Sequence, residues 1–432
     1  MRDPVGVEAL GDICITGGGP LGGTISVQSS KNAALPMMAA SCLHKGTSVL
    51  RDCPRIADVD SMIRILRRMG ADIRWEGKDL YLDCSMLENM VIPGTYTERM
   101  RSSVILLSVM LARKGWGSLG YPGGCVIGKR PIDMHLAALG KLGAQIRESP
   151  EVIEAECGRL KGTGICFPKR SVGATQQGIL AAVLAEGETV LENCAREPEI
   201  CWLCRYLQSM GARIAGEGSD CIRIQGVSQL EAGDFRVPPD RIVAGTYICA
   251  AAISRGSITL ERFPDGELDA FLQVYRKMGG QYEGKSGKLL VNGNGVRFSP
   301  GRIVTETFPG FPTDLQAPLM AVLTTVDGVS EIKEQIFENR FQVVRQMNKM
   351  GADIRVEDHT AVIHGGRPLR GCRVQAQELR GGAALILMAL AAEGETWLEG
   401  DFFIQRGYEH ICEDLSSVGG MIKKTQEYEY KI

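Results

Sequence analysis

The chain repeats one pattern of apolar and polar positions about every 70 residues. Each copy predicts a nearly apolar helix, a short strand, an amphipathic helix and further short strands, which we class as a βαβαββ unit. The amphipathic helix is clearest from Asp58 to Met69, where apolar residues recur on one face at helical spacing. A glycine suits the left-handed end of such a helix. The six glycines at these ends are Gly70, Gly143, Gly211, Gly279, Gly351 and Gly419.

The first helix of each unit has no polar face. The clearest examples cover residues 103–111, 178–184, 243–253 and 383–392. A helix that is apolar all round must be enclosed, so the pattern predicts helices inside and sheets outside. Six copies divide naturally into two domains of three, and 432 residues also exceed what one core usually holds.

Composition excludes some classes of binding partner. A formal net charge of −2, with 23% charged residues, argues against binding to nucleic acid or to a membrane through a polybasic surface. The longest apolar runs are shorter than the roughly 20 residues that a membrane span needs, and the N-terminus lacks the apolar region of a secretory signal. We therefore expect a cytoplasmic protein without a membrane anchor.

The cysteines and histidines indicate neither a disulfide framework nor a metal site. Fourteen cysteines in a long chain without a secretory signal are expected to be mostly small buried hydrophobic residues. Cys201 and Cys204 have redox spacing, but they lie inside a predicted amphipathic helix, which favours a structural role. The five histidines have no metal-ligand spacing.

The starts of the apolar helices carry the candidate chemistry. Unpaired N–H groups and the helix dipole attract anions there, and nearly every start also carries a cation. Any single start fits ordinary N-capping with solvated basic residues, but six together favour a cleft for substrates with phosphate or carboxylate groups. These starts cover residues 29–32, 98–102, 169–173, 240–241, 312–314 and 378–382.

Four further features leave alternatives open. Cys125 lies in a glycine-rich loop before Lys129, so it is either an activated thiol on a lid or an ordinary turn residue. Asp314 heads an apolar helix, where capping is the commoner role and a proton acceptor the functional one. Asp58 and Asp60 fit N-cap positions and suit pairing with arginines. The glycines of residues 17–23 resemble a phosphate loop, but strand-like residues follow, which favours a hairpin turn.

Motifs over essentially the whole chain resemble the UDP-N-acetylglucosamine 1-carboxyvinyltransferases of the enolpyruvyl transferase family. They cover residues 30–36, 122–125, 128–133, 195–199, 239–241, 311–314, 337–341 and 406–408. The resemblance implies a two-domain inside-out α/β barrel. Its domains would be residues 31–238, and residues 1–30 with 239–432, with the active site in the cleft between them.

The resemblance also implies the reaction. The enolpyruvyl group of phosphoenolpyruvate would pass to the 3-hydroxyl of UDP-N-acetylglucosamine with release of phosphate, the first committed step of peptidoglycan synthesis. No metal, organic cofactor or obligate protein partner is implied. The implied catalytic residues are Cys125, Asp314, Lys31 and Arg406.

The implied binding residues form two sets. Those for phosphoenolpyruvate are Lys31, Asn32, Arg130, Arg340, Arg380 and Arg406. Those for the nucleotide sugar are Asn32, Arg101, Arg130, Pro131, Ile132, Asp133, Met134, Lys169, Arg170, Ser171, Val172, Asp314 and Ile336.

Two residues depart from the family pattern, because Gln405 and Glu378 stand where Asp is usual. A second paralogue, or a divergent transferase with another acceptor such as shikimate 3-phosphate, therefore remains an alternative. The glycine, alanine and arginine motif of the shikimate enzyme is not apparent. A third alternative is an inactive paralogue that binds nucleotide sugars, against which Cys125, Asp314 and Lys31 argue.

Overall fold

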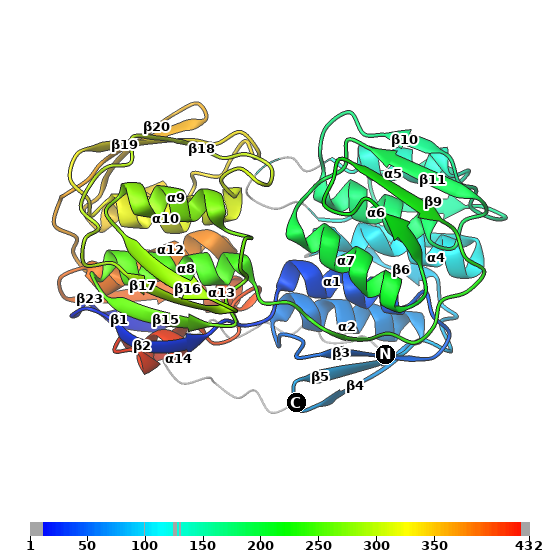
Figure 1. Cartoon of the computed structure of the whole chain (residues 1–432), viewed down its shortest axis with the longest axis horizontal. Coiled ribbons are helices and arrows are strands. Elements are labelled where there is room, and N and C mark those ends of the chain that lie inside the picture. Colours follow the sequence, from blue (N-terminus) through cyan, green and yellow to red (C-terminus); the bar gives the residue numbers. More distant parts are fainter. Residues whose placement is uncertain (1–11, 99, 124–127, 129–130, 425–432) are drawn as a thin grey trace. The chain divides into compact units, whose positions relative to one another are not determined.

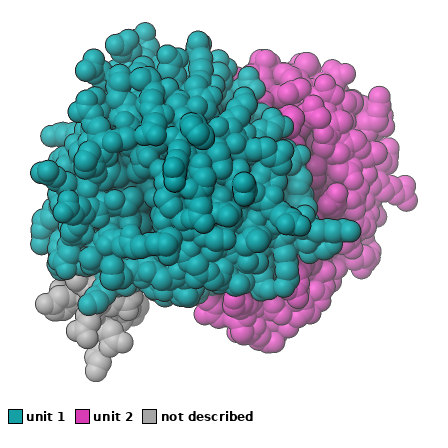
Figure 2. Space-filling model, turned by 60° about the vertical axis from the view of Figure 1, so that its left-hand side comes forward, with its two compact units in different colours: residues 1–28, 239–306, 310–432 teal, residues 29–238, 307–309 magenta. Residues whose placement is uncertain are grey.

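The computed structural model describes residues 12–98, 100–123, 128 and 131–424. The described chain forms two compact units, each with its own apolar core. Unit 1 takes residues 12–28, 239–306 and 310–424, and unit 2 takes residues 29–238 and 307–309 (teal and magenta in Figure 2). The chain therefore passes between the units after Gln28 and again after Pro238.

Unit 2 contains three copies of the repeat. The first consists of α1 (Lys31–Ser41), β3 (Thr47–Arg51), α2 (Ala57–Met69), β4 (Asp72–Glu76) and β5 (Asp79–Asp83). The second consists of β6 (Val91–Ile92), α3 (Gly94–Thr97), the 3₁₀-helix η1 (Arg101–Ile105), α4 (Leu106–Lys114), β7 (Trp116–Gly120), α5 (Asp133–Lys141), β8 (Gln145–Glu148) and β9 (Val152–Glu156). The third consists of β10 (Gly164–Cys166), α6 (Val172–Ala182), β11 (Glu188–Glu192), α7 (Pro198–Ser209), β12 (Arg213–Ala215) and β13 (Cys221–Gln225), and β14 (Asp234–Arg236) follows it.

Unit 1 begins with β1 (Ile13–Thr16) and β2 (Gly22–Ser26) and then contains the other three copies. The fourth consists of α8 (Arg241–Ile253), β15 (Ser257–Glu261), α9 (Asp269–Lys277), β16 (Gln281–Lys285) and β17 (Lys288–Asn292). The fifth consists of β18 (Arg302–Val304), the 3₁₀-helix η2 (Thr313–Leu315), α10 (Gln316–Leu323), β19 (Val329–Lys333), α11 (Val344–Lys349), β20 (Asp353–Glu357) and β21 (Thr360–His364). The sixth consists of β22 (Arg373–Gln375), α12 (Leu379–Ala391), β23 (Glu395–Glu399), α13 (Asp401–Gln405), α14 (Ile411–Ser417) and β24 (Met421–Lys424).

Each repeat has its own four-stranded sheet, and the described chain has six of these. In every sheet one edge strand pairs in parallel with its neighbour and the remaining pairs are antiparallel, as in β18-β19-β21-β20. Within each unit the sheets lie outside the apolar helices (Figure 1). This arrangement confirms the predicted α/β fold of six repeated units with enclosed helices.

Two strands are exchanged between repeats. β2 precedes α1 in the chain but pairs in parallel with β15 of unit 1, whereas β14 precedes α8 but pairs in parallel with β3 of unit 2. β1 lies between β23 and β24, so the first and last described strands share one sheet. The exchange accounts for the crossings after Gln28 and after Pro238.

The enclosed helices follow the predicted pattern, with corrections to their bounds. The helices predicted over 243–253 and 383–392 begin earlier, at Arg241 and Leu379. Every residue of α8 and α10 is buried, and α8, α10 and α12 contact one another inside unit 1. The helix predicted over 178–184 begins earlier, at Val172, because Ser171 caps it by accepting a hydrogen bond from the Ala174 N–H. The helix predicted over 103–111 is divided into η1 and α4.

The predicted hairpin over residues 17–23 is wrong. β1 and β2 flank this segment, but they belong to different sheets and do not pair with each other. Gly17 serves a close approach instead, since a Cβ there would lie 1.7 Å from the carbonyl oxygen of Ala392. In the described ranges, no helix combines the length and apolar character that crossing a membrane requires.

The six glycines after the second helices all have positive φ, between 94° and 109°, which confirms the predicted left-handed ends. Two of them in unit 2 give a matched test. At Gly211 a Cβ would have nothing within 4 Å, whereas at Gly70 it would lie 2.3 Å from the carbonyl oxygen of Met86.

We expect Gly211→Ala to cost about 1 to 2 kcal/mol of folding free energy through backbone strain alone. Gly70→Ala adds a backbone clash and lowers the melting temperature further. Thermal unfolding of both variants measures the difference, and equal shifts would contradict this account.

Candidate active site

In unit 1, the starts of two enclosed helices and the turn before α11 bring one carboxylate and two guanidinium groups together. Asp314 lies in η2 before α10, Arg340 in the turn before α11, and Arg380 in the first turn of α12. The Asp314 carboxylate accepts hydrogen bonds from Nη2 of Arg340 at 2.7 Å and from Nη2 of Arg380 at 3.3 Å. We call these three residues the Asp314 clamp. Asp314 and Arg340 were predicted to act on substrate, and the structure places them in contact.

The clamp is buried on its arginine side and open on its carboxylate side. The side chains of Arg340 and Arg380 are each 3% exposed, whereas that of Asp314 is 29% exposed. Nε of Arg340 and Nη1 of Arg380 are buried without a hydrogen-bond partner among the described residues. Such donors favour a further acceptor, and bidentate contact with a carboxylate or phosphate is what a guanidinium offers. The clamp therefore suits an anionic ligand.

Arg380 is kept charged by its surroundings. Burial alone disfavours its charged form, but Tyr408, Asp314 and Asp240 outweigh that effect and raise the pKa of the guanidinium. The guanidinium also lies 5.4 Å from the centre of the Tyr408 ring. Asp240 caps α8 by accepting from the N–H groups of Ile242 and Val243. The starts of α8, α10 and α12 therefore act on one place in unit 1.

The two residues that depart from the family pattern have structural partners. Glu378 caps α12, because its carboxylate accepts hydrogen bonds from the N–H groups of Arg380 and Gly381. Nε2 of Gln405 donates to the buried carboxylate of Asp401 at 2.5 Å within α13. α13 thus keeps a carboxylate one turn before the position where the family usually has one. Arg406 follows as the C-cap of α13 and is half-buried.

In unit 2, the start of α1 carries a paired lysine. Nζ of Lys31 lies 3.2 Å from Oδ2 of Asp58, and their side chains are 14% and 8% exposed. Ser30 caps α1 by accepting from the Ala33 N–H, and half-buried Asn32 follows Lys31. The N-cap prediction for Asp58 and Asp60 is wrong, since Ile56 is the N-cap of α2 and both aspartates lie in its first turn.

The other predicted sugar-binding residues of unit 2 lie at three helix starts. Ser171 caps α6, Lys169 before it is exposed, and Arg170 and Val172 are half-buried. A Cβ on Gly173 would lie 2.5 Å from Nε2 of His135, so α5 packs directly against the start of α6. At the start of α5, Ile132 and Met134 are buried and Pro131 and Asp133 are exposed.

Arg101 begins η1 and donates from Nη1 to the carbonyl oxygen of Pro122 at 3.4 Å. This bond ties η1 to the segment that precedes the predicted lid. Cys125 and Arg130 lie outside the described residues. Ile336 is 37% exposed in the segment between β19 and α11.

Sequence reasoning missed three contributions to these sites. It assigned no partner to Lys31, although Asp58 was noted, and it gave Asp240 and Tyr408 no role beside Arg380. Tyr408 stands in a motif that carried the resemblance, which was the available signal.

The described cysteines are free thiols, and burial raises the pKa of Cys204 in α7, in keeping with its predicted structural role.

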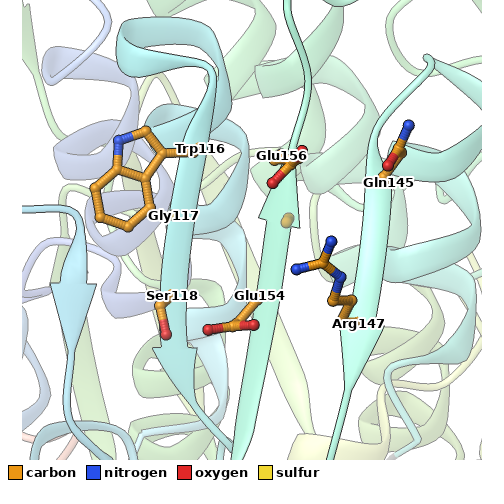
Figure 3. A pocket seen from close by; sticks show the side chains of 8 residues that line it. Trp116, Gly117, Ser118, Gln145, Arg147, Glu154 and Glu156 are labelled. Carbon is orange, nitrogen blue, oxygen red and sulfur yellow. The ribbon is translucent and has the colours of Figure 1, made fainter.

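A surface hollow in unit 2 contains none of the predicted site residues. It lies on the sheet β7-β9-β8 and is lined by Trp116, Ser118, Arg147, Glu154 and Glu156 among others (Figure 3). Arg147 and Glu154 face each other across β8 and β9. Opposite charges at such an exposed cross-strand position commonly stabilise a sheet, so we assign no site here.

Comparisons with known proteins agree with these features. The family model described as EPSP synthase (3-phosphoshikimate 1-carboxyvinyltransferase) matches residues 15–415. UDP-N-acetylglucosamine 1-carboxyvinyltransferase 2 of Caldanaerobacter subterraneus subsp. tengcongensis is 42% identical, with 96% of this chain and 99% of the relative covered. UDP-N-acetylglucosamine 1-carboxyvinyltransferase of Oleidesulfovibrio alaskensis is 43% identical, with 96% and 99% covered.

The crystal structure of the enolpyruvyl transferase NikO from Streptomyces tendae has a TM-score of 0.87 at 22% identity. It covers 96% of this chain and 99% of its own, which confirms the fold. The motif resemblance to the UDP-N-acetylglucosamine 1-carboxyvinyltransferases is confirmed by the relatives. The chain therefore belongs to the EPSP synthase family of carboxyvinyltransferases.

Proposed function

We propose that this protein transfers the enolpyruvyl group of phosphoenolpyruvate to the 3-hydroxyl of UDP-N-acetylglucosamine and releases phosphate. The names of its relatives over nearly the whole chain support the acceptor. The observation that carries the chemistry is the Asp314 clamp, in which a partly exposed carboxylate is held by two buried guanidinium groups. The reaction would be the first committed step of peptidoglycan synthesis in the cytoplasm and would serve cell-wall biogenesis, cell shape and cell division.

The proposed roles follow from charge and exposure. Arg340 and Arg380 would hold the carboxylate of phosphoenolpyruvate, both with the donors that now bind Asp314 and with the donors that have no hydrogen-bond partner among the described residues. Lys31, Arg130 and Arg406 would hold its phosphate, with Asn32 nearby. These residues belong to both units, so the proposal requires both sets to meet around the substrates.

The nucleotide sugar would be held by a second set of residues. Its anchors in unit 2 would be the starts of η1, α5 and α6, whose unpaired N–H groups favour a diphosphate. In unit 1, Asp314 and Ile336 would face the sugar. The full set is Asn32, Arg101, Arg130, Pro131, Ile132, Asp133, Met134, Lys169, Arg170, Ser171, Val172, Asp314 and Ile336.

The proposed chemistry needs a proton acceptor and a proton donor. O3 of the sugar would bond to C2 of phosphoenolpyruvate as its proton passes to Asp314, and C3 would take a proton from Cys125. Loss of a C3 proton and of phosphate would then restore the double bond. Cys125 could alternatively hold a covalent adduct. Excluding water would protect the intermediate during these steps.

The clamp also suggests how Asp314 becomes a base. Taking up a proton would cost it two ion pairs with buried partners. A substrate carboxylate that engages Arg340 and Arg380 would supply the negative charge in its place. Binding of phosphoenolpyruvate would then release Asp314 for the sugar hydroxyl.

The acceptor is tested by phosphate release from phosphoenolpyruvate. We expect turnover with UDP-N-acetylglucosamine and none with shikimate 3-phosphate, the acceptor suggested by the name of the family model. The reverse result would overturn the acceptor assignment. Absent turnover in wild type with intact sugar binding would instead support a nucleotide-sugar-binding paralogue.

The clamp is tested by Asp314→Asn. We expect turnover to fall by roughly 10² to 10⁴-fold because the proton acceptor is lost. Phosphoenolpyruvate should bind about tenfold more tightly, because its carboxylate no longer competes with Asp314 for the two guanidinium groups. Calorimetry with phosphoenolpyruvate as the only substrate measures the affinity of both proteins without turnover. Weaker binding than in wild type would contradict the competition.

Cys125 is tested with fosfomycin, which should be opened by its thiolate with formation of one S–C bond and cleavage of one C–O bond of the epoxide. Peptide mass spectrometry should find an adduct of the whole inhibitor on Cys125, and Cys125→Ser should abolish it. An adduct on another cysteine, or none, would count against the proposed role of this thiol.

A further inference from the structure

Glu334 is a buried carboxylate in the described part of unit 1 that has no cationic partner there. It follows β19 directly and is 2% exposed. Its carboxylate accepts three hydrogen bonds instead. Oε2 accepts from the Thr313 hydroxyl at 2.9 Å, and Oε1 accepts from the N–H groups of Ile336 at 2.8 Å and Phe337 at 3.2 Å. A buried charge is tolerated when its acceptor capacity is used in this way.

The donors around Glu334 belong to two of the three segments that form the Asp314 clamp, those of Asp314 and Arg340. Thr313 is the residue before Asp314. The guanidinium of Arg340 lies 5.3 Å from the centre of the Phe337 ring and donates to Asp314 at 2.7 Å. Glu334 is therefore linked to Asp314 through Thr313 and to Arg340 through Phe337, and the hydrogen bond between Arg340 and Asp314 joins these two links.

The segment from Glu334 to Val343 has neither helix nor strand to fix it. Its backbone N–H groups at Ile336 and Phe337 are bound by a side chain rather than by a neighbouring strand. The next support is also a side chain, since the Gln335 N–H donates to the buried hydroxyl of Thr305 at 3.0 Å. The position of exposed Ile336 thus depends on the Glu334 carboxylate.

We propose that Glu334 is a positioning residue, which sets the spacing between the proton acceptor Asp314 and the turn that contacts the nucleotide sugar through Ile336. The inference rests on the proposed function. Glu334 acts through Thr313 on one side and through the Ile336 and Phe337 N–H groups on the other. The first link orients Asp314 for proton transfer, and the second shapes the sugar contact.

The two links are separable by substitution. Glu334→Ala removes both, Thr313→Val removes only the hydroxyl next to Asp314, and Glu334→Gln keeps one oxygen for the two N–H groups. Glu331→Ala is the matched control, because Glu331 lies on β19 with a side chain 46% exposed. Steady-state kinetics with both substrates, calorimetry of UDP-N-acetylglucosamine binding and melting temperatures would be measured for each variant.

We expect Glu334→Ala to lower kcat about 100-fold and raise the KM and the dissociation constant for UDP-N-acetylglucosamine about tenfold. Thr313→Val should lower kcat about tenfold while the sugar KM stays within about threefold of wild type. Glu334→Gln should restore the sugar KM, and Glu331→Ala should match wild type.

A merely structural role predicts a different pattern, in which lower melting temperatures and a smaller active fraction reduce kcat while both KM values stay unchanged. That pattern, or unchanged kinetics in Glu334→Ala with an active wild type, would overturn this inference and leave the proposed function intact. A wild type that neither binds nor converts UDP-N-acetylglucosamine would overturn the proposed function, and the inference with it.

Discussion

A helix that is apolar on every side can offer chemistry only at its ends, and this constraint governs the molecule. Each repeat encloses such a helix, as in α8, where every residue is buried. The sides of these helices are used for packing, so charged residues collect at their starts, where N–H groups and the dipole favour anions. Three starts act on one place in unit 1 through Asp240, Asp314 and Arg380. The same constraint that builds the core thus determines where a substrate can be bound.

Buried cations at these starts and in the turn before α11 are paired before any substrate arrives. Lys31 is held by Asp58, and Arg340 and Arg380 are held by Asp314. Pairing offsets the cost of burial, and it also means that an incoming anion must exchange partners with a carboxylate of the protein. Because Asp314 is more exposed than its arginine partners, it is the member of the clamp that can be displaced. In the proposed reaction, the ion pairs that stabilise the buried arginines in the free protein therefore also hold Asp314 until a substrate anion releases it to accept a proton.

The periodic pattern of the sequence predicted the helices and their ends, which depend on local burial. It did not predict contacts between segments that are far apart in the chain. It predicted the helix from Asp58 to Met69 within one residue and the left-handed glycines that end the second helices. It did not predict that Asp58 pairs with Lys31, since that contact joins two repeat elements 27 residues apart. Nor did it predict that β1 and β2 join different sheets, because a glycine run looks the same in a hairpin and in a close approach. The resemblance, not the period, supplied Arg340 and Arg380 as partners in one site.

The irregular segments between the repeated elements make the six helix starts differ from one another. Six similar units supply six similar helix starts, but a transferase must treat two different substrates differently, so the starts need unequal surroundings. In the fifth repeat that inequality comes from the segment between β19 and α11, which is held by Glu334 and Thr305 instead of by backbone pairing. The segment brings Arg340 to Asp314 and exposes Ile336. Specificity in this fold would therefore reside less in the repeated elements than in the side chains that fix the turns between them.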